Sequence, residues 1–338
     1  MPSRIVSVCK SGEYQGLAKA LSVSTINSPD MWGRFPVYYA VRYNNIAALR
    51  YMLELGADPY VESTISGRRD NLVMTALRTG VVETVKVVIS IWRSYTDISD
   101  LLPLCFSKDN STELLASVIE GFNIRSLKGA ESVLCRRAKI GDFEWLLHHN
   151  ICFDLQQALR YCLIYGRPHC FMYLLRYIKH QCELDYVYTN AGSRGTHTLV
   201  SLCCLYGHYK GLLKLLKLGA SADVITINNH GETMNNLCVA VANEHYRHLR
   251  DIYQTGVTLC IKYLISQGVS LNWQNSRGQT ALMMAMRAHN GELTNLLLAA
   301  GADPTLRDMN GESAADYMMG GGEGMGEEDG EETSNVVN

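Results

Sequence analysis

Four groups of cysteine and histidine residues have side chains that could bind a metal ion. They are Cys203-Cys204 with His208, Cys162 with His169-Cys170, the pair His148-His149, and His245 with His248. A structural zinc site needs paired spacings such as Cys-x-x-Cys that bring four ligands together. None of the groups has that spacing. We therefore expect no metal site, and we expect these residues to lie in the core, in turns and at helix ends.

Two motifs of catalytic chemistry are absent from the sequence. There is no Gly-x-Ser-x-Gly segment, which would place a serine nucleophile on a tight turn, and no Gly-x-x-x-x-Gly-Lys-Ser/Thr loop, which would cradle phosphates. The glycine run at 320–324 follows no strand pattern and precedes no helix pattern. The sequence therefore predicts no catalytic residues and no bound cofactor, and we expect a protein that is not an enzyme.

A segment that ends in Gly-Ala-Asp, or in a close variant of it, recurs along almost the whole chain. Its glycine falls at positions 56, 219, 268 and 301. Gly268 and Gly301 are 33 residues apart, and the 163 residues from Gly56 to Gly219 are close to five such intervals. The 49 residues from Gly219 to Gly268 make one repeat that carries about 16 extra residues. A fixed period of this length indicates a repeat architecture.

Each interval carries the pattern of two short helices joined by a turn. The less obvious units lie at 72–88, 101–119, 133–147 and 158–175, and units at 5–21 and 311–317 close the ends. We expect about nine repeats within residues 1–319, with degenerate sequences at 100–190. We place the extra residues near 243–255, between the two helices of that repeat. The long polar segment 179–194 is either an enlarged turn that contacts a partner or a surface loop.

The repeat resembles the ankyrin repeat. The resemblance covers nearly all of 1–319 and is strongest at 31–60, 195–221 and 275–317. It implies an all-α fold, an ankyrin-repeat solenoid of stacked helix-turn-helix units with β-turn fingers. In such units, Gly33, Gly278 and Gly311 occupy turns where a positive φ is favourable only without a Cβ atom. Thr198 and Thr280 are expected to cap the first helices of their repeats.

The resemblance also implies a binding surface. In that family, a concave groove is lined by finger residues and by the last residues of each first helix. Carried over to this chain, the candidate partner-binding residues are Met31, Trp32, Arg34, Arg42, Tyr43, Arg78, Thr79, Lys139, Tyr165, His197, Leu205, Tyr206, Arg277, Gln279 and Arg287. Six of them are Lys or Arg, four are Trp or Tyr, and none is acidic. We therefore expect the groove to bind an acidic or phosphorylated protein segment.

Two alternatives compete with this hypothesis. The absence of acids could arise by chance or from misalignment of part of the set. The chain could also bind single-stranded nucleic acid, because aromatic rings beside cations stack on bases. Against nucleic acid, the chain outside the segment 320–338 has a net charge of only +4, and no extended run of Lys or Arg occurs. Nucleic-acid footprints are usually more basic.

The composition favours a reducing compartment. The chain has 11 cysteines, an odd number, and several lie on predicted helix faces. Free cysteine behaves as a small buried hydrophobe, and disulfides are rare in the cytosol and nucleus. The sequence shows no charged-then-apolar leader and no run of 18 apolar residues, so we expect neither secretion nor a membrane span. We expect a cytoplasmic protein, with the nucleus as the alternative.

The segment 320–338 differs from the rest of the chain. It contains six acidic residues, no Lys or Arg, and no helical period. Such a composition predicts disorder. The segment is either a solubilising end, or it folds back onto the basic groove and competes with the partner. Truncation after Met319 would raise the affinity for the partner only in the second case.

Together these features predict a non-enzymatic protein-protein interaction module that acts as an adaptor or scaffold. Divergent repeats of this kind are similar to the host-interacting ankyrin proteins of viruses and intracellular bacteria. They are equally similar to ordinary cellular adaptors.

Overall fold

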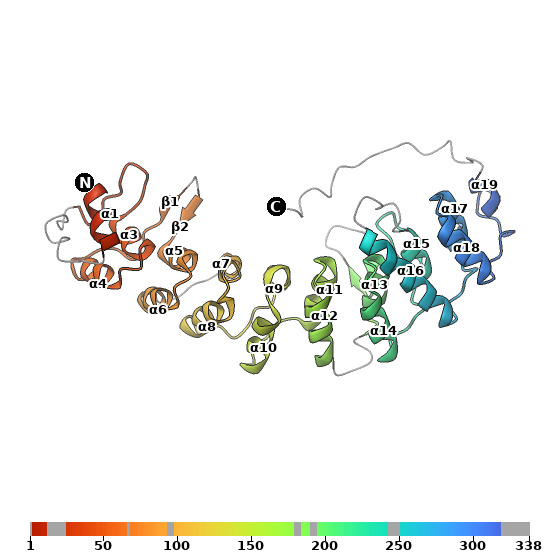
Figure 1. The fold of residues 1–338 in the computed structure, drawn as a ribbon, viewed down its shortest axis with the longest axis horizontal. Coiled ribbons are helices and arrows are strands. Elements are labelled where there is room, and N and C mark those ends of the chain that lie inside the picture. Colours follow the sequence, from red (N-terminus) through yellow and green to blue (C-terminus); the bar gives the residue numbers. More distant parts are fainter. Residues whose placement is uncertain are drawn as a thin grey trace. The chain divides into compact units, whose positions relative to one another are not determined.

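The computed structural model of the protein describes residues 2–11, 25–65, 68–92, 98–178, 184–189, 195–242 and 251–318. Most of these residues are helical, and a few short antiparallel strands accompany the helices (Figure 1). The chain divides into two compact units, Met1–Leu175 and Arg176–Asn338, which we call unit 1 and unit 2. The predicted acidic segment 320–338 lies outside the described residues.

Unit 1 is built from pairs of short helices. The first helices of the pairs are α3 (Pro36–Arg42), α5 (Leu72–Thr79), α7 (Leu102–Cys105), α9 (Glu131–Arg137) and α11 (Leu155–Ile164). The second helices are α4 (Ile46–Glu54), α6 (Val82–Ile91), α8 (Ser111–Gly121), α10 (Ile140–His148) and α12 (Pro168–Leu174). Helix α1 (Pro2–Ser11) precedes them, the antiparallel hairpin of β1 (Ser63–Ile65) and β2 (Arg68–Asp70) precedes α5, and the 3-10 turn η1 (Leu175–Tyr177) follows α12.

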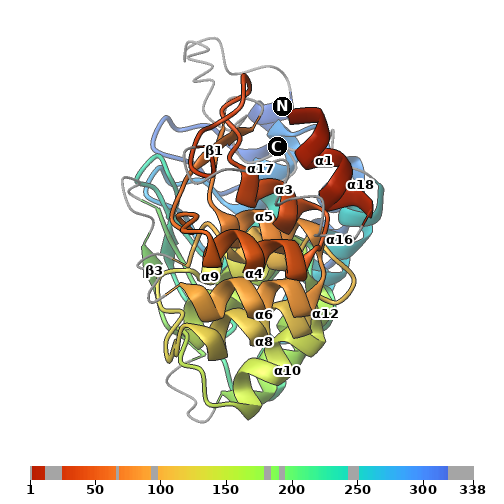
Figure 2. The ribbon, with the colours of Figure 1, turned by 90° about the vertical axis from the view of Figure 1, so that its left-hand side faces the viewer.

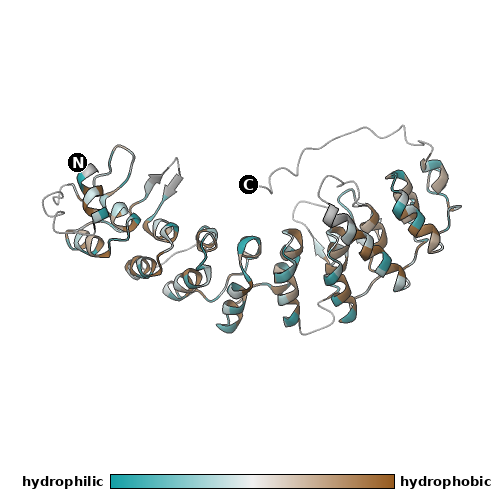
Figure 3. Ribbon diagram, in the orientation of Figure 1, coloured by the Kyte–Doolittle hydropathy of each residue, from teal (hydrophilic) through white to brown (hydrophobic). Residues whose placement is uncertain are grey.

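The helices of unit 1 pack in two rows. First helices contact first helices, from α3 through α5, α7 and α9 to α11, and second helices do the same from α6 through α8 and α10 to α12. Figure 2 shows α4, α6 and α8 in successive layers. The helices carry hydrophobic and hydrophilic residues side by side (Figure 3), and apolar residues such as Ala40, Ala76 and Leu115 are fully buried. Each pair therefore depends on its neighbours to cover its apolar face.

Unit 2 repeats this arrangement. Its first helices, which contact one another in this order, are α13 (Leu199–Leu205), α15 (Asn236–Ala242), α17 (Ala281–Arg287) and α19 (Ala314–Met318). Its second helices are α14 (Tyr209–Lys217), α16 (Asp251–Ser266) and α18 (Gly291–Ala299). The strands β3 (Tyr188–Thr189), β4 (Thr196–His197), β5 (Thr226–Ile227) and β6 (Thr233–Met234) form one antiparallel sheet in the order β3-β4-β5-β6.

Polar side chains define where several helices begin. The hydroxyls of Thr198 and Thr280 accept the backbone N–H groups of the third helical residues of α13 and α17, which confirms the two predicted caps. Asn45, Asn71 and Asn290 cap α4, α5 and α18 in the same way, although the sequence analysis did not single them out. Each cap satisfies a backbone donor that the helix itself leaves unpaired.

The turn glycines have the predicted backbone conformation. Gly33, Gly278 and Gly311 have φ values of +73°, +77° and +80°. At Gly278 there is a second requirement, because a Cβ atom would lie 2.9 Å from the backbone nitrogen of Met309. The glycine therefore allows both the left-handed turn and the close approach of the next repeat.

A helix pair lies at each of the units predicted at 72–88, 101–119, 133–147 and 158–175. Helix α16 begins at Asp251, so the last residues of the expected insertion 243–255 are helical and lengthen the second helix of that repeat. Residues 243–250 lie outside the described residues. The segment 179–194 is described only at 184–189, where Tyr188 and Thr189 form β3 and pair with β4.

Candidate binding surface

The first helices of unit 1 end at turns that hydrogen bonds connect from one repeat to the next. The amide of Asn110 donates to the Gly80 carbonyl (3.0 Å), and the Lys139 ammonium donates to the Asp109 carbonyl (3.3 Å). We call the turns at 42–45, 78–81, 107–110, 136–139 and 165–167 the turn row. The predicted binding residues on the turn row are Arg42, Tyr43, Arg78, Thr79, Lys139 and Tyr165.

The turn that precedes α3 holds Trp32 and Arg34 in a defined conformation. One carboxylate oxygen of Asp30 accepts the backbone N–H groups of Trp32 and Arg34, both at 2.9 Å. The guanidinium carbon of Arg34 lies 5.6 Å from the centroid of the Trp32 ring. Met31 is 82% exposed and Trp32 is 53% exposed. The turn therefore presents a large apolar and aromatic area beside a cation whose position is fixed.

The charges at this turn are set by the same hydrogen bonds. Partial burial alone would raise the pKa of Asp30, but hydrogen bonds from the Tyr39 hydroxyl and from the backbone of Arg34 and Trp32 outweigh it and lower the pKa below its usual value. The pKa of the Arg34 guanidinium is raised, chiefly by its hydrogen bond with Tyr39. At neutral pH, Asp30 is therefore ionised and Arg34 is protonated.

Several of the predicted cations face carboxylates. The Arg78 guanidinium makes two bonds to Asp70, Nε to Oδ2 at 2.8 Å and Nη2 to Oδ1 at 3.0 Å, and Asp70 is buried. The other two pairs are Lys139 with Asp109 at 3.8 Å and Arg277 with Glu232. Three cations of the candidate set therefore have carboxylate neighbours that the set does not contain. These carboxylates lie on β2, on the turn at 107–110 and on the finger at 226–234, and folding brings them to the cations.

Two predicted cations remain uncompensated. Arg42 and Arg287 are exposed, and neither has a hydrogen bond or an ion pair with any described residue. Tyr43, next to Arg42, lies under the Lys10 ammonium, which is 5.2 Å from the ring centroid. The net positive charge of the candidate set is therefore concentrated at Arg42 and Arg287.

The predicted residue Tyr165 belongs to a larger cluster. Its hydroxyl lies 2.7 Å from the Ser132 hydroxyl, and the guanidinium carbon of Arg136 lies 5.9 Å from its ring centroid. Sequence reasoning missed Arg136 and its neighbour Arg137. The available signal was the density of charge at 136–139, where three of four residues are Lys or Arg.

The predicted residues of unit 2 are less accessible. Gln279 is buried, and its amide donates to the Tyr317 hydroxyl (2.8 Å) and accepts from Asn275 (3.3 Å). We therefore remove Gln279 from the binding set, because its polar atoms already serve the fold. Leu205 and Tyr206 at the end of α13 are half-buried, as is His197 in β4.

The β-turn fingers of unit 2 are linked to one another by the backbone. The β3–β6 sheet joins β3 and β4 to the finger at 226–234. The Thr233 N–H then donates to the Ser276 hydroxyl (3.2 Å), and the Met309 N–H donates to the Arg277 carbonyl (3.0 Å). We call the strands β3 and β4 and the fingers at 226–234, 274–279 and 307–313 the finger row. Four successive repeats therefore share one continuous set of links.

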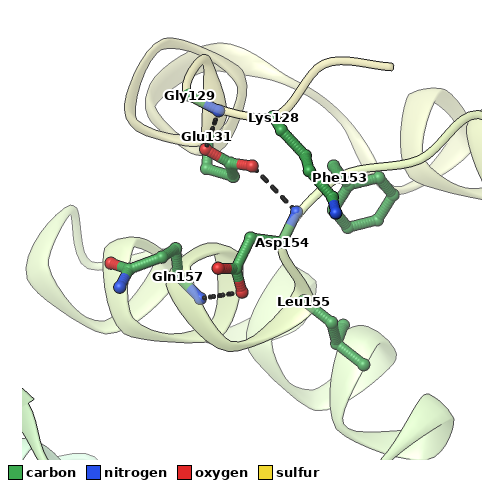
Figure 4. A pocket seen from close by; sticks show the side chains of 7 residues that line it. All are labelled: Lys128, Gly129, Glu131, Phe153, Asp154, Leu155 and Gln157. Atoms are coloured by element: carbon green, nitrogen blue, oxygen red, sulfur yellow. Dashed lines mark hydrogen bonds between the residues drawn. The ribbon is translucent and has the colours of Figure 1, made fainter. Parts of the chain in front are cut away.

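A shallow hollow lies in unit 1 where the connections between repeats are short (Figure 4). Its lining residues are Lys128, Gly129, Glu131, Phe153, Asp154, Leu155 and Gln157. The buried Glu131 carboxylate accepts the backbone N–H groups of Gly129 and Asp154, each at 2.8 Å, and Asp154 caps α11 by accepting the Gln157 N–H at 3.1 Å. Both carboxylates thus accept hydrogen bonds from backbone N–H groups and serve to fix the local chain conformation.

The cysteines are core residues. Ten free cysteines are found among the described residues, and all except Cys152 are buried. Burial raises the pKa of Cys9, Cys238 and Cys260 to about 12, so these thiols are poor nucleophiles at neutral pH. Within the described ranges, no three His, Cys, Asp or Glu side chains come together as a metal site would require. None of the helices in these ranges is long and apolar enough to span a bilayer.

One comparison with known proteins gives a match. Residues 264–318, which include the end of α16 and all of α17, α18 and α19, match the family model for ankyrin repeats (many copies). No curated protein matches the chain.

Proposed function

We propose that the chain is an ankyrin-repeat protein and that it is a non-enzymatic interaction module, an adaptor or scaffold that holds another protein. Ankyrin repeats generally mediate protein-protein interaction. We further propose that residues 1–319 form one ankyrin solenoid of about nine repeats. This is supported by the order of helix pairs within each unit, which follows the predicted repeat units one by one.

The observation that carries the proposal is the exposed Trp32 turn. Met31 and Trp32 expose a contiguous apolar area beside Arg34, and the Asp30 carboxylate fixes the turn before any partner arrives. Trp and Arg dominate interface energies because they combine large contact area with polar groups. A side chain that is already ordered also loses little entropy on binding. We therefore propose that Trp32 is the anchor of the interface.

We propose that the bound segment is acidic or phosphorylated. Arg42 lies at the end of α3, the helix that follows the Trp32 turn, and has no described carboxylate partner. The Arg34 guanidinium carbon lies 5.9 Å from the centroid of the Tyr38 ring. Burial and the Asp70 carboxylate raise the pKa of Tyr38, whereas the charges of Arg42 and Arg34 act to lower it. An anionic side chain beside an apolar anchor would satisfy both features of this surface.

The test is an affinity pull-down with the tagged full-length chain, because the identity of the bound partner would identify the pathway. A stoichiometric partner recovered with the wild-type protein should be lost with the double variant Trp32→Ala, Arg42→Glu. The control is Arg50→Glu, which reverses an exposed cation on α4 and should leave recovery unchanged. Equal recovery by the wild type and the double variant would sink the proposal. The same experiment decides whether the partner belongs to the protein's own cell or to a host.

We propose a reducing compartment, the cytoplasm or nucleus, as the place of action. The free thiols of the described cysteines support this assignment, because an oxidising compartment would favour disulfides.

A further inference from the structure

Cations and tyrosines alternate along α9 and α11 of unit 1. The guanidinium of Arg160 lies 5.4 Å from the Tyr161 ring centroid, and the Tyr161 and Tyr165 rings stack at 5.9 Å with an interplanar angle of 13°. Arg136 then lies 5.9 Å from the Tyr165 ring. The row joins two neighbouring repeats, because Arg136 lies in the last turn of α9, Tyr161 lies on α11, and Tyr165 directly follows the end of α11.

Two exposed cations extend this row on the turn between α9 and α10. Arg137 is exposed and has no hydrogen bond or ion pair with a described residue, and Lys139 is exposed with one fully exposed carboxylate partner, Asp109. We call Arg136, Arg137, Lys139, Tyr161 and Tyr165 the Arg136 patch. It is a part of the turn row at which three cations fall within four residues.

The patch has a fixed shape. The Arg167 guanidinium donates to the Arg136 carbonyl at 3.0 Å and to the Ala138 carbonyl at 2.5 Å, which closes the C-terminal end of α9. The contact between the Tyr165 and Ser132 hydroxyls ties α11 to α9. Because the turn and the tyrosines are already ordered before binding, the binding of a ligand would cost little conformational entropy.

Two acidic residues close to the patch in sequence point into the fold. Asp142 is fully buried and accepts hydrogen bonds from the hydroxyls of Ser111 (3.0 Å) and Thr112 (2.6 Å) and from the Lys139 N–H (2.7 Å). Glu131 is also buried and accepts two backbone N–H groups. These two carboxylates therefore face the interior, while Arg136, Arg137 and Lys139 are exposed and the exposed Asp109 is the carboxylate partner of Lys139.

Within the proposed interaction function, on which this step rests, we infer that the Arg136 patch binds an acidic segment of a partner protein through its carboxylate or phosphate groups. Arginine matches these groups by paired N–H donors. A nucleic acid fits the patch less well. Each tyrosine ring already has a cation and the other ring against it, which leaves little ring face on which a base could stack.

The test is fluorescence anisotropy with the full-length chain and three labelled probes. The probes are a 16-residue peptide of alternating Glu and Ser, the same peptide with two phosphoserines, and a 16-residue oligothymidylate. We expect the double variant Arg137→Glu, Lys139→Glu to bind the peptides at least about tenfold more weakly at low salt. The matched control, Arg50→Glu, Lys86→Glu, reverses two exposed cations on α4 and α6 of the same unit and should change the affinity by less than about twofold. A tighter complex with the phosphorylated peptide would identify phosphate as the preferred anion, and equal affinities would identify carboxylates.

Three results would overturn the inference. They are unchanged peptide binding by the Arg137, Lys139 variant, an equal loss in the control variant, and tighter binding of the oligothymidylate than of either peptide. The single variant Arg137→Gln keeps the test valid if the double variant is unstable, because Arg137 contacts no described residue through hydrogen bonds or ion pairs. Trp32→Ala, Arg42→Glu separates the two proposals. If that variant loses the cellular partner while the Arg136 patch proves inert, the proposed function stands and this inference fails.

Discussion

Neighbouring repeats are joined differently in the two units. In unit 2, the finger row links four repeats through strand pairing and backbone hydrogen bonds. In unit 1, residues 98–178 are all described and contain no strand, and one isolated parallel bridge joins Ser126 to Cys152. There the buried carboxylates of Glu131 and Asp142 connect one repeat to the next.

The difference shows how a repeat can diverge without losing its stacking. Backbone links depend on chain geometry, so many side chains are compatible with them. A buried carboxylate connects two repeats with far fewer residues, but the connection then depends on a single side chain. This fits the sequence: the match to the ankyrin family model lies in unit 2, and the repeats with short connections are the degenerate ones.

The largest effect is expected from the change Asp142→Ala. It would leave the Ser111 hydroxyl and the Lys139 N–H without their acceptor in a buried site, and we expect a loss of about 3 kcal/mol of stability. Urea unfolding followed by circular dichroism measures the loss. The exposed Asp109 serves as the control, because Asp109→Ala should cost less than about 0.5 kcal/mol. Equal costs would show that Asp142 does not link the repeats.

Gly278→Ala should be the next largest. A left-handed φ costs a residue with a Cβ atom about 1–2 kcal/mol, and here the Cβ would also lie 2.9 Å from the Met309 nitrogen and 3.0 Å from the Asp308 Cα. We expect a total near the upper end of that range, about 2 kcal/mol. Gly231→Ala is the matched control, with φ at +82° and no atom within 4 Å of its Cβ, and it should cost about 1 kcal/mol. If the two variants have the same unfolding midpoint, the close approach of the fingers is not a constraint.

Ser276→Ala removes a single link of the finger row and should have a small effect. The Thr233 N–H loses its acceptor, but Ser276 is exposed and water can take its place. We expect about 0.5 kcal/mol, measured by the same urea titration. A cost as large as that of Asp142→Ala would erase the proposed difference between the units.

The smallest effect concerns pH at the Trp32 turn. The pKa of Asp30 is lower in the folded protein than its usual value, so its contribution to stability is present at neutral pH. That contribution is lost as the pH falls from about 3.9, the usual value for Asp, through the folded-state pKa. The stability difference between the wild type and Asp30→Asn should therefore be constant from pH 7 to 5 and shrink below about pH 4. A difference that grows on acidification would contradict the lowered pKa.

Much of the helical framework could be predicted from the sequence, because it depends on local and periodic signals. The units at 72–88, 101–119, 133–147 and 158–175 each contain a helix pair, even though their sequences are degenerate. Thr198 and Thr280 cap the helices they were expected to cap. Helix α16 includes the last residues of the expected insertion 243–255, and the sequence did not indicate this because an insertion can lengthen a helix without any change in the flanking pattern.

The candidate site was less predictable. The family alignment selected positions such as Arg78 and Gln279, but it could not indicate that Asp70 pairs with Arg78 or that Tyr317 accepts a bond from Gln279. It also passed over Arg136, whose neighbour Tyr165 lies 29 residues further along the chain. Asp70 and Arg78 are 8 residues apart, and the other two contacts join residues about one repeat apart. A single sequence carries no direct signal for any of them.

The sequence by itself determined the repeat period, the helix pairs, the turn glycines and the buried thiols, because each follows from nearby residues and from the alternation of apolar and polar positions. The tertiary structure decided which charges are compensated, which polar groups are buried and where cations and rings gather. The physical reason is that stacking places residues of successive repeats side by side, and the energy of a charge depends on those neighbours. The Trp32 turn shows both parts: its glycine and its exposed aromatic follow from the sequence, while the packing of Tyr39 against Asp30 and Arg34 fixes its charge.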